Sequence, residues 1–180
     1  ALLLVGDTSG TMLKPSCDYN ADVIADRLLF GSGGAAVAME RVHNSKVYYQ
    51  NESNGSGYEA IHSFLSAPME MDGKKVFDFA INDVADSVAL FRKHFNLSEE
   101  MIDYYVFHQA QRLILDNLAM TLDIPEEKEL RSIEEFGNTS GTSVIISVCH
   151  NVDTLKENGE TGSLMTGVGG GLSGGSVYAL

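Results

Sequence analysis

The clearest periodic pattern in the chain lies between Val76 and Phe95. Apolar residues recur there at alternating spacings of four and three, and they are Phe77, Ile81, Val84, Val88, Phe91 and Phe95. This spacing is the stripe of an amphipathic helix that packs on a sheet. We therefore predict a helix over this range, with its apolar face turned toward strands.

Two further helices are predicted in the second half of the chain. Residues 109–122 have helical spacing through Ala110, Ile114, Leu118 and Leu122. A third helix is defined by Val144, Ile145, Val148, Val152 and Leu155, and it ends at Asn158-Gly159, a good C-terminal signal. Cys149 lies close to the apolar face of this helix, where we expect it to be a small core residue.

Short apolar runs predict the strands. ALLLV (residues 1–5) and RLLF (27–30) indicate short buried strands, and AAVAME after GSGG indicates the next strand of a hairpin. Later strands are IDYYVF (102–107), SLMTGV (163–168) and SVYAL (176–180), with the tight loop GGGLSGG before the last one. Residues 50–73 are polar and glycine-rich, which favours exposed loops. Strands separated by helices indicate an α/β fold with a layered sheet, whose ligand crevice lies beyond the carboxyl ends of strands.

Composition narrows the classes of partner. The 180 residues suit one domain with a sizeable core. Because no apolar run approaches about 18–20 residues, we expect no membrane partner. The net charge of −13 disfavours nucleic acid, which is bound through clustered Lys and Arg. Two cysteines in a chain without a secretory signal lead us to expect a cytoplasmic protein, and the start on Ala indicates a fragment or a processed piece.

His108 is the first candidate for chemistry. It stands at the predicted switch from a strand to a helix, in YYVFHQAQRL, where an imidazole would face the crevice and could act as donor or base. The alternative is a packing histidine. No histidine pair has H-x3-H spacing, so a metal site is unsupported.

Two more segments are candidates with open alternatives. In GNTSG (137–141), Asn138, Thr139 or Ser140 could cap the following helix; alternatively, Asn138 donates its amide to a developing oxyanion. The glycines of GVGGGLSGG (167–175) either form a turn between strands or present backbone amides to an anion. Neither common nucleotide fingerprint is present. Neither Cys17, in a polar loop, nor Cys149 has the surroundings of an activated nucleophile.

The order of these strands, helices and motifs along the chain points to a family more specifically than any one of them does. The order strand, HQA, helix, GNTSG, helix, strand, GGG, strand resembles the C-terminal part of the 3-oxoacyl-[acyl-carrier-protein] synthase III group of thiolase-like condensing enzymes, and LLFGSGGAAV resembles another of its segments. The resemblance implies the C-terminal half of a thiolase-like fold with a mixed sheet layered with helices. It also implies two regions: residues 1–40, which would complete the preceding half of the fold, and residues 41–180, which would carry the His/Asn pair.

The activity that the resemblance implies is decarboxylative Claisen condensation in fatty acid or polyketide-type biosynthesis. His108 and Asn138 would be the catalytic pair that stabilises the enolate of malonyl-acyl-carrier protein, and the Gly170 N–H would belong to the oxyanion hole. Gln109 would be a supporting residue in the substrate-binding region, and Arg112 would contact coenzyme A or the carrier. The substrates would be acyl-CoA and carrier-protein thioesters, without a resident cofactor, in a homodimer.

The chain departs from the family pattern in ways that leave two rival functions open. The family's nucleophilic cysteine belongs to the preceding half of the fold, and neither Cys17 nor Cys149 matches its motif. Arg112 stands one position from the family's arginine, and Val168 and Leu172 flank GGG where larger aromatic residues are common in the family. The rivals are a non-catalytic thiolase-like partner subunit and an acyltransferase of the same fold that releases no CO2.

Overall fold

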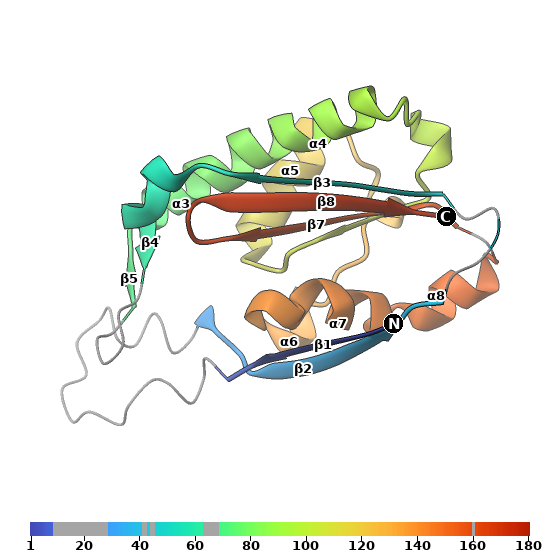
Figure 1. The fold of residues 1–180 in the computed structure, drawn as a ribbon, viewed down its shortest axis with the longest axis horizontal. Helices are drawn as coiled ribbons and strands as arrows, with labels where there is room; N and C mark the ends of the chain where they lie inside the picture. Colours follow the sequence, from blue (N-terminus) through green and yellow to red (C-terminus); the bar gives the residue numbers. More distant parts are fainter. Residues whose placement is uncertain (9–28, 41–42, 44–45, 63–68, 160) are drawn as a thin grey trace.

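A mixed four-stranded sheet forms the centre of the computed structural model, which describes residues 1–8, 29–40, 43, 46–62, 69–159 and 161–180. The strand order is β3 (Val47–Ser53), β8 (Ser173–Ala179), β7 (Ser163–Gly169), β6 (Tyr104–Phe107). β6 and β7 are parallel, and the other two pairs are antiparallel. Helices lie on both sides of this sheet (Figure 1), so the prediction of a layered mixed sheet is confirmed.

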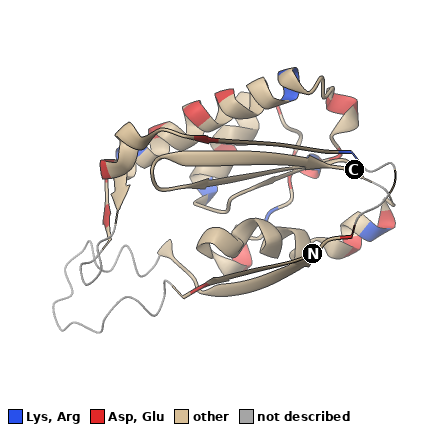
Figure 2. Cartoon of the chain, viewed as in Figure 1, with Lys and Arg blue, Asp and Glu red and all other residues tan. Residues whose placement is uncertain are grey.

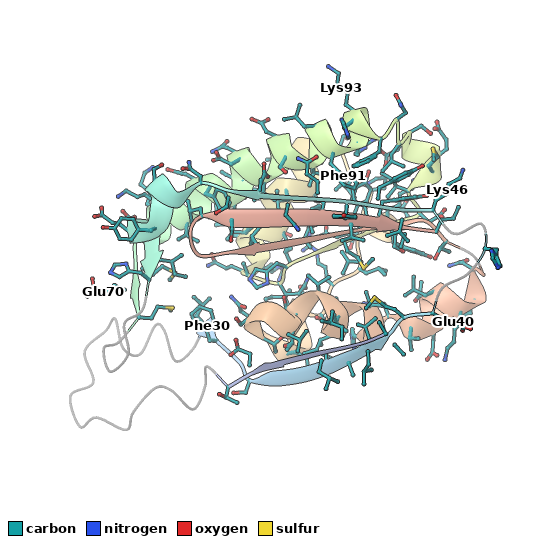
Figure 3. All side chains as sticks on the ribbon, in the orientation of Figure 1. Phe30, Glu40, Lys46, Glu70, Phe91 and Lys93 are labelled. Carbon is teal, nitrogen blue, oxygen red and sulfur yellow. The ribbon has the colours of Figure 1, made fainter. Side chains whose placement is uncertain are left out.

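A long helical segment covers one face of the sheet together with α5 (Arg112–Leu122) (Figure 1). It consists of α3 (Gly73–Asp78), the π-helical turn η2 (Phe79–Asp83) and α4 (Val84–His94). The Asp72 side chain caps its start by accepting a hydrogen bond from the N–H of Lys75. Phe91 points from α4 toward the sheet while Lys93 points away from it (Figure 3). The predicted helix is therefore confirmed, with a π turn that the spacing did not indicate.

Strand β6 is buried on both faces because a helical layer lies on each side. Tyr105 and Phe107 belong to the core beneath α4 and α5. Tyr104 and Val106 pack on the opposite side, against residues of α7 (Ser143–His150) and α8 (Val152–Glu157). This double burial explains the continuous apolar run in the sequence.

The second face of the sheet also carries the short helix α6 (Ile133–Phe136) and the 3-10 turn η5 (Ser140–Thr142), which leads into α7. Beyond α7, on the side away from the central sheet, lies a pair of antiparallel strands, β1 (Leu2–Asp7) and β2 (Gly33–Ala38) (Figure 1). A Cβ added at Gly33 would lie 2.6 Å from Oγ1 of Thr142 and 2.9 Å from Cδ1 of Ile146. The close approach of β2 to α7 therefore requires glycine at this position.

Two predictions about the N-terminal strands are wrong. Leu2, Leu3 and Leu4 form a strand as predicted, but their side chains are exposed rather than buried. The 3-10 turn η5 packs against β1, and it meets the strand at Val5, beyond the three leucines. In RLLF, residues 27 and 28 lie outside the described residues, and Phe30 makes an isolated bridge with Asn138 instead of a strand. The hairpin partner of β2 is β1.

The segment expected to form exposed loops, residues 50–73, is partly regular. β3 continues to Ser53 because its backbone pairs with β8, and it is followed by η1 (Gly55–Ala60), β4 (Ile61–His62) and β5 (Glu70–Met71). Residues 63–68 lie outside the described residues. Backbone pairing at a sheet edge thus outweighs the polar composition of the segment.

The predicted helices in the second half of the chain differ from the observed ones in their boundaries and in the exposure of one residue. The helix after β6 begins at Arg112 rather than at residue 109. The helix predicted through Leu155 ends at His150 and restarts at Val152, because the Asn151 side chain donates to the backbone oxygens of Ser147 and Arg131 at the break. Cys149 is exposed, so its assignment to the core is wrong. The 3-10 turns η3 (Glu99–Met101) and η4 (Glu126–Lys128) complete the elements of the described residues.

Candidate active site

His108, Asn138 and Gly170 come from three different loops. His108 directly follows β6, and its backbone N–H donates to the oxygen of Thr166 in β7 at 2.8 Å. Asn138 follows α6 after Gly137, whose φ of 64° gives the chain a left-handed turn before η5. Gly170 lies in the turn between β7 and β8. All three loops lie at the end of the sheet where β6 and β7 terminate.

The three residues line one cavity of about 150 Å³. Apolar side chains from α3, η2, α5, β7 and the β7–β8 turn make up most of its wall, among them Val76, Phe77, Phe79, Ala80, Ile114, Val168 and Leu172. Among the described residues that line it, none is Asp, Glu, Lys or Arg. β7 and β8 carry no charged residue, whereas the charged residues of the described chain lie on helices, on connecting segments and on the other strands β1, β3 and β5 (Figure 2). The cavity is thus an uncharged space with a few polar groups at one end.

The side chain of Asn138 has a defined orientation. Its Oδ1 accepts a hydrogen bond from the N–H of Ser140 at 2.9 Å, and its Nδ2 donates to the oxygen of Ala110 at 3.2 Å. The side chain is almost fully buried. Since an amide nitrogen carries two protons, one donor of Nδ2 is left for a ligand. The amide oxygen therefore stabilises the turn at Ser140 while one N–H stays available. The N-caps of η5 and α7 are Thr139 and Thr142, so the reading of Asn138 as the cap of the following helix is wrong.

His108 is held as a neutral imidazole. Burial lowers the pKa of its ring from 6.5 to about 4, and a hydrogen bond with the Ser140 backbone offsets only part of this effect. Nδ1 lies 2.7 Å from Oγ of Ser143, the first residue of α7. At neutral pH the ring therefore has one N–H to donate and carries no charge.

The family of the chain follows from its sequence similarity to a family model and to known proteins. Residues 93–179 match the family model described as 3-Oxoacyl-[acyl-carrier-protein (ACP)] synthase III C terminal. A beta-ketoacyl-[acyl-carrier-protein] synthase III of Streptococcus equi subsp. zooepidemicus is 35% identical over 166 residues, which cover 83% of this chain and 51% of that protein. This chain belongs to the 3-oxoacyl-[acyl-carrier-protein] synthase III family.

Solved structures of synthase III proteins have the same fold. The enzyme from Pseudomonas aeruginosa PAO1 aligns with a TM-score of 0.83 at 28% identity, over 98% of this chain and 56% of its own. The protein from Aquifex aeolicus VF5 aligns with a TM-score of 0.78 at 29% identity, over 84% of this chain and 50% of its own. The fold is therefore thiolase-like, and the chain spans about half the length of the curated relatives that it matches.

Gln109 and Arg112, the other two residues singled out by the synthase III resemblance, do not line the cavity. Gln109 is fully buried: its Nε2 donates to the oxygen of Phe107, and its Oε1 accepts from the N–H groups of Ser132 and Ile133. It thereby fastens the end of β6 to the start of α6. Arg112 is exposed, with its Nε 3.9 Å from the Asp116 carboxylate.

Several residues that line the cavity of this synthase III chain were not predicted from its sequence. Gln111 lines the cavity at the start of α5, and its position three residues after His108 was a usable signal. Phe79 and Ala80 reach the cavity from the π turn η2, an irregularity that is frequent at functional sites and that no spacing pattern indicated. Nothing in the sequence indicated the contact of Ser143 with His108, because that contact depends on how α7 packs against the end of β6.

Metal sites and membrane-spanning helices are not found in the described part of the chain. Among the described residues, no group of three or more His, Cys, Asp or Glu side chains is arranged to hold a metal ion. No helix in the described part of the chain is both long and apolar enough to cross a membrane.

Proposed function

We propose that this chain is the C-terminal half of an acyltransferase that condenses an acyl thioester with malonyl-acyl-carrier protein, with loss of CO2, in fatty acid or polyketide-type biosynthesis. The observation that carries the proposal is the pair of donors, the neutral ring of His108 and the amide of Asn138, at one end of an uncharged cavity. Membership of the synthase III family supports the same reaction class.

In this proposal His108 and Asn138 donate hydrogen bonds to the carbonyl oxygen of the malonyl thioester. When the bond to the carboxylate breaks, CO2 leaves and its electron pair forms an enolate whose negative charge rests on that oxygen. Two neutral donors stabilise this developing charge more strongly in an uncharged cavity than in water. The absence of carboxylates from the described lining fits this role, because a carboxylate would repel the enolate.

The enolate carbon then attacks the acyl group held as a thioester on a cysteine. We propose that this cysteine belongs to the preceding half of the fold, since neither Cys17 nor Cys149 matches the family's motif. The backbone N–H of Gly170 would donate to the oxyanion of the tetrahedral intermediate, which collapses to the 3-oxoacyl thioester and releases the cysteine thiolate. The position of Gly170 in the cavity wall supports this assignment.

The substrates in this proposal are acyl-CoA and malonyl-acyl-carrier protein, with no resident cofactor. A cavity of about 150 Å³ is small beside typical ligand pockets of about 300–1,000 Å³, so we propose that the preceding half completes the site. Gln109 would support the loop that carries His108. The exposed guanidinium of Arg112 would contact coenzyme A or the carrier protein.

The division into residues 1–40 and 41–180 is part of the same proposal. The packing of β1 and β2 on the face of α7 opposite the central sheet supports the assignment of residues 1–40 to the preceding half of the fold. We also propose a cytoplasmic homodimer. Light scattering of the intact protein would test the dimer, and a monomeric mass would refute it.

The experiment that tests the proposal is a pair of substitutions in the intact protein. His108→Ala and Asn138→Ala should each lower malonyl condensation by on the order of 10²-fold or more, because each removes a donor to the enolate. Self-acylation by acyl-CoA should change little. Lys93→Ala, on the outer side of α4, is the matched surface control. Undiminished condensation in both variants would refute the assignment, and an intact protein that never self-acylates would favour a non-catalytic partner subunit.

A further inference from the structure

We infer that Ser143 is a positioning residue that selects the neutral tautomer of His108 with its proton on Nε2. The inference rests on the proposed function, because it concerns the nitrogen that His108 would offer to the enolate. Ser143 is the first residue of α7, and its Oγ lies 2.7 Å from Nδ1 of His108.

Proton counting at the Ser143 hydroxyl identifies the donor. A hydroxyl group has one proton to give and two lone pairs. The backbone N–H of Gln109 donates to Oγ of Ser143 at 3.1 Å, so one lone pair is occupied. Among the described residues, Nδ1 of His108 is the other hydrogen-bond partner of this oxygen.

Two arrangements of the Ser143–His108 hydrogen bond are then possible. If Nδ1 carried the proton, Oγ would accept from both neighbours, and its own proton would be buried without an acceptor. An unsatisfied buried donor costs about 1–3 kcal/mol. Ser143 is about 1% exposed, so water does not supply the missing acceptor easily. If Ser143 donates to Nδ1, all three groups are satisfied.

The favoured arrangement leaves Nε2–H as the donor of the imidazole. Nδ1 is occupied by Ser143, and the ring itself lines the cavity. Because burial keeps the ring neutral near pH 7, the choice of tautomer decides whether Nε2 donates or accepts. Only the donor form can stabilise an enolate oxygen.

The same geometry argues against a nucleophilic role for Ser143. A serine within hydrogen-bond distance of a histidine is a common arrangement for nucleophilic catalysis. Here, however, the hydroxyl is buried and Ser143 is not among the residues that line the cavity, so it does not face the space proposed for the substrate. Ser143 therefore acts through His108.

The test is ¹⁵N NMR of the intact protein with labelled histidine at pH 7, with His108 assigned from the signal lost in His108→Gln. We expect Nε2 to be protonated and Nδ1 unprotonated in the unsubstituted protein. In Ser143→Ala the two ring nitrogens should shift toward values averaged over both tautomers, whereas Ser143→Thr, which keeps a hydroxyl, should restore the signature. Ser147→Ala is the matched control, since Ser147 is an equally buried serine of α7 that bonds to Ser132 instead.

Protonated Nδ1 in the unsubstituted protein would overturn the inference, because the ring would then donate to Ser143 or to the Ser140 backbone. An unchanged spectrum in Ser143→Ala would overturn it as well. Condensation in Ser143→Ala should fall about tenfold or more in kcat, with little change in KM. If the NMR signature behaves as expected but the intact protein does not condense malonyl thioesters, the proposed function fails while the role of Ser143 in selecting the tautomer stands.

Discussion

The side-chain amide of Asn138 donates to the backbone oxygen of Ala110 at 3.2 Å and so joins the loop after α6 to the loop after β6. These loops carry Asn138 and His108, which are 30 positions apart in the chain. The backbone oxygen of Asn138 also accepts from the N–H of Gly31 at 2.7 Å, which ties the segment before β2 to the same place. The candidate site is therefore held by contacts from three separate parts of the chain.

Replacing Asn138 by Asp should separate the accepting role of its side-chain oxygen from the donating role of its side-chain nitrogen. Asp keeps an oxygen that can accept from the Ser140 N–H but removes both amide protons and adds a negative charge beside the Ala110 oxygen. We expect condensation to fall by on the order of 10²-fold or more, at least as far as in Asn138→Ala, because the carboxylate would also repel the enolate. Steady-state kinetics of the intact protein would measure this. A milder loss in Asn138→Asp than in Asn138→Ala would contradict the donor role.

Gln109 should matter for stability. Gln109→Leu leaves the buried N–H groups at the start of α6 without an acceptor, and each unsatisfied group costs about 1–3 kcal/mol. We expect the free energy of unfolding to fall by at least about 2 kcal/mol in urea denaturation. Arg112→Ala, three residues away and exposed, should change it by less than about 0.5 kcal/mol. Equal effects of the two substitutions would argue against the buried network.

The neighbouring glycines of β2 offer a matched pair. In Gly33→Ala the new Cβ would lie within 3 Å of Thr142 and Ile146, so the contact between β2 and α7 must open, at a cost of about 1–3 kcal/mol. In Gly34→Ala the Cβ meets nothing within 4 Å, and stability should be unchanged or slightly higher. Thermal unfolding of both variants would measure the difference. Similar midpoints would show that this contact does not hold the β1–β2 pair.

The depressed pKa of His108 predicts a pH-dependent stability. Below pH 6.5 the unfolded chain binds a proton at this histidine, whereas the folded chain does so only near pH 4. The buried neutral ring therefore lowers stability only in acid. Its effect on the free energy of unfolding is absent above pH 6.5 and reaches a loss of about 3 kcal/mol as the pH falls to about 4. The difference in unfolding free energy between the unsubstituted protein and His108→Gln isolates it, because other groups titrate alike in both. A difference that stays constant from pH 7 to pH 4 would contradict a buried neutral imidazole.

Much of the fold could be predicted because local patterns reflect local burial. The stripe from Val76 to Phe95 and the apolar run of β6 each pack in the way that their spacing indicates. β3 was missed because it is an edge strand with the polar sequence Gln50–Ser53, which is stabilised by pairing with β8 rather than by burial. The exposure of Leu2, Leu3 and Leu4 could not be predicted, because the pattern of a strand does not show which other elements pack against it.

Some residues of the candidate site could likewise be predicted from the sequence, and others could not. His108, Asn138 and Gly170 could be found because each follows an element within a short motif, and the structure brings all three to one cavity. Ser143 and the apolar wall could not be assigned, because their places depend on how α7 and the π turn of the long helical segment approach the end of β6. Tertiary packing, rather than residue type, determines those contacts.

The most direct test of the central proposal is to measure CO2 release and 3-oxoacyl product together, in the intact protein supplied with acyl-CoA and carboxyl-labelled malonyl-acyl-carrier protein. We expect one CO2 per product formed, and both should fall by on the order of 10²-fold or more in His108→Ala and in Asn138→Ala while self-acylation persists. Acyl transfer to an acceptor without CO2 release, or undiminished CO2 release in both variants, would contradict it.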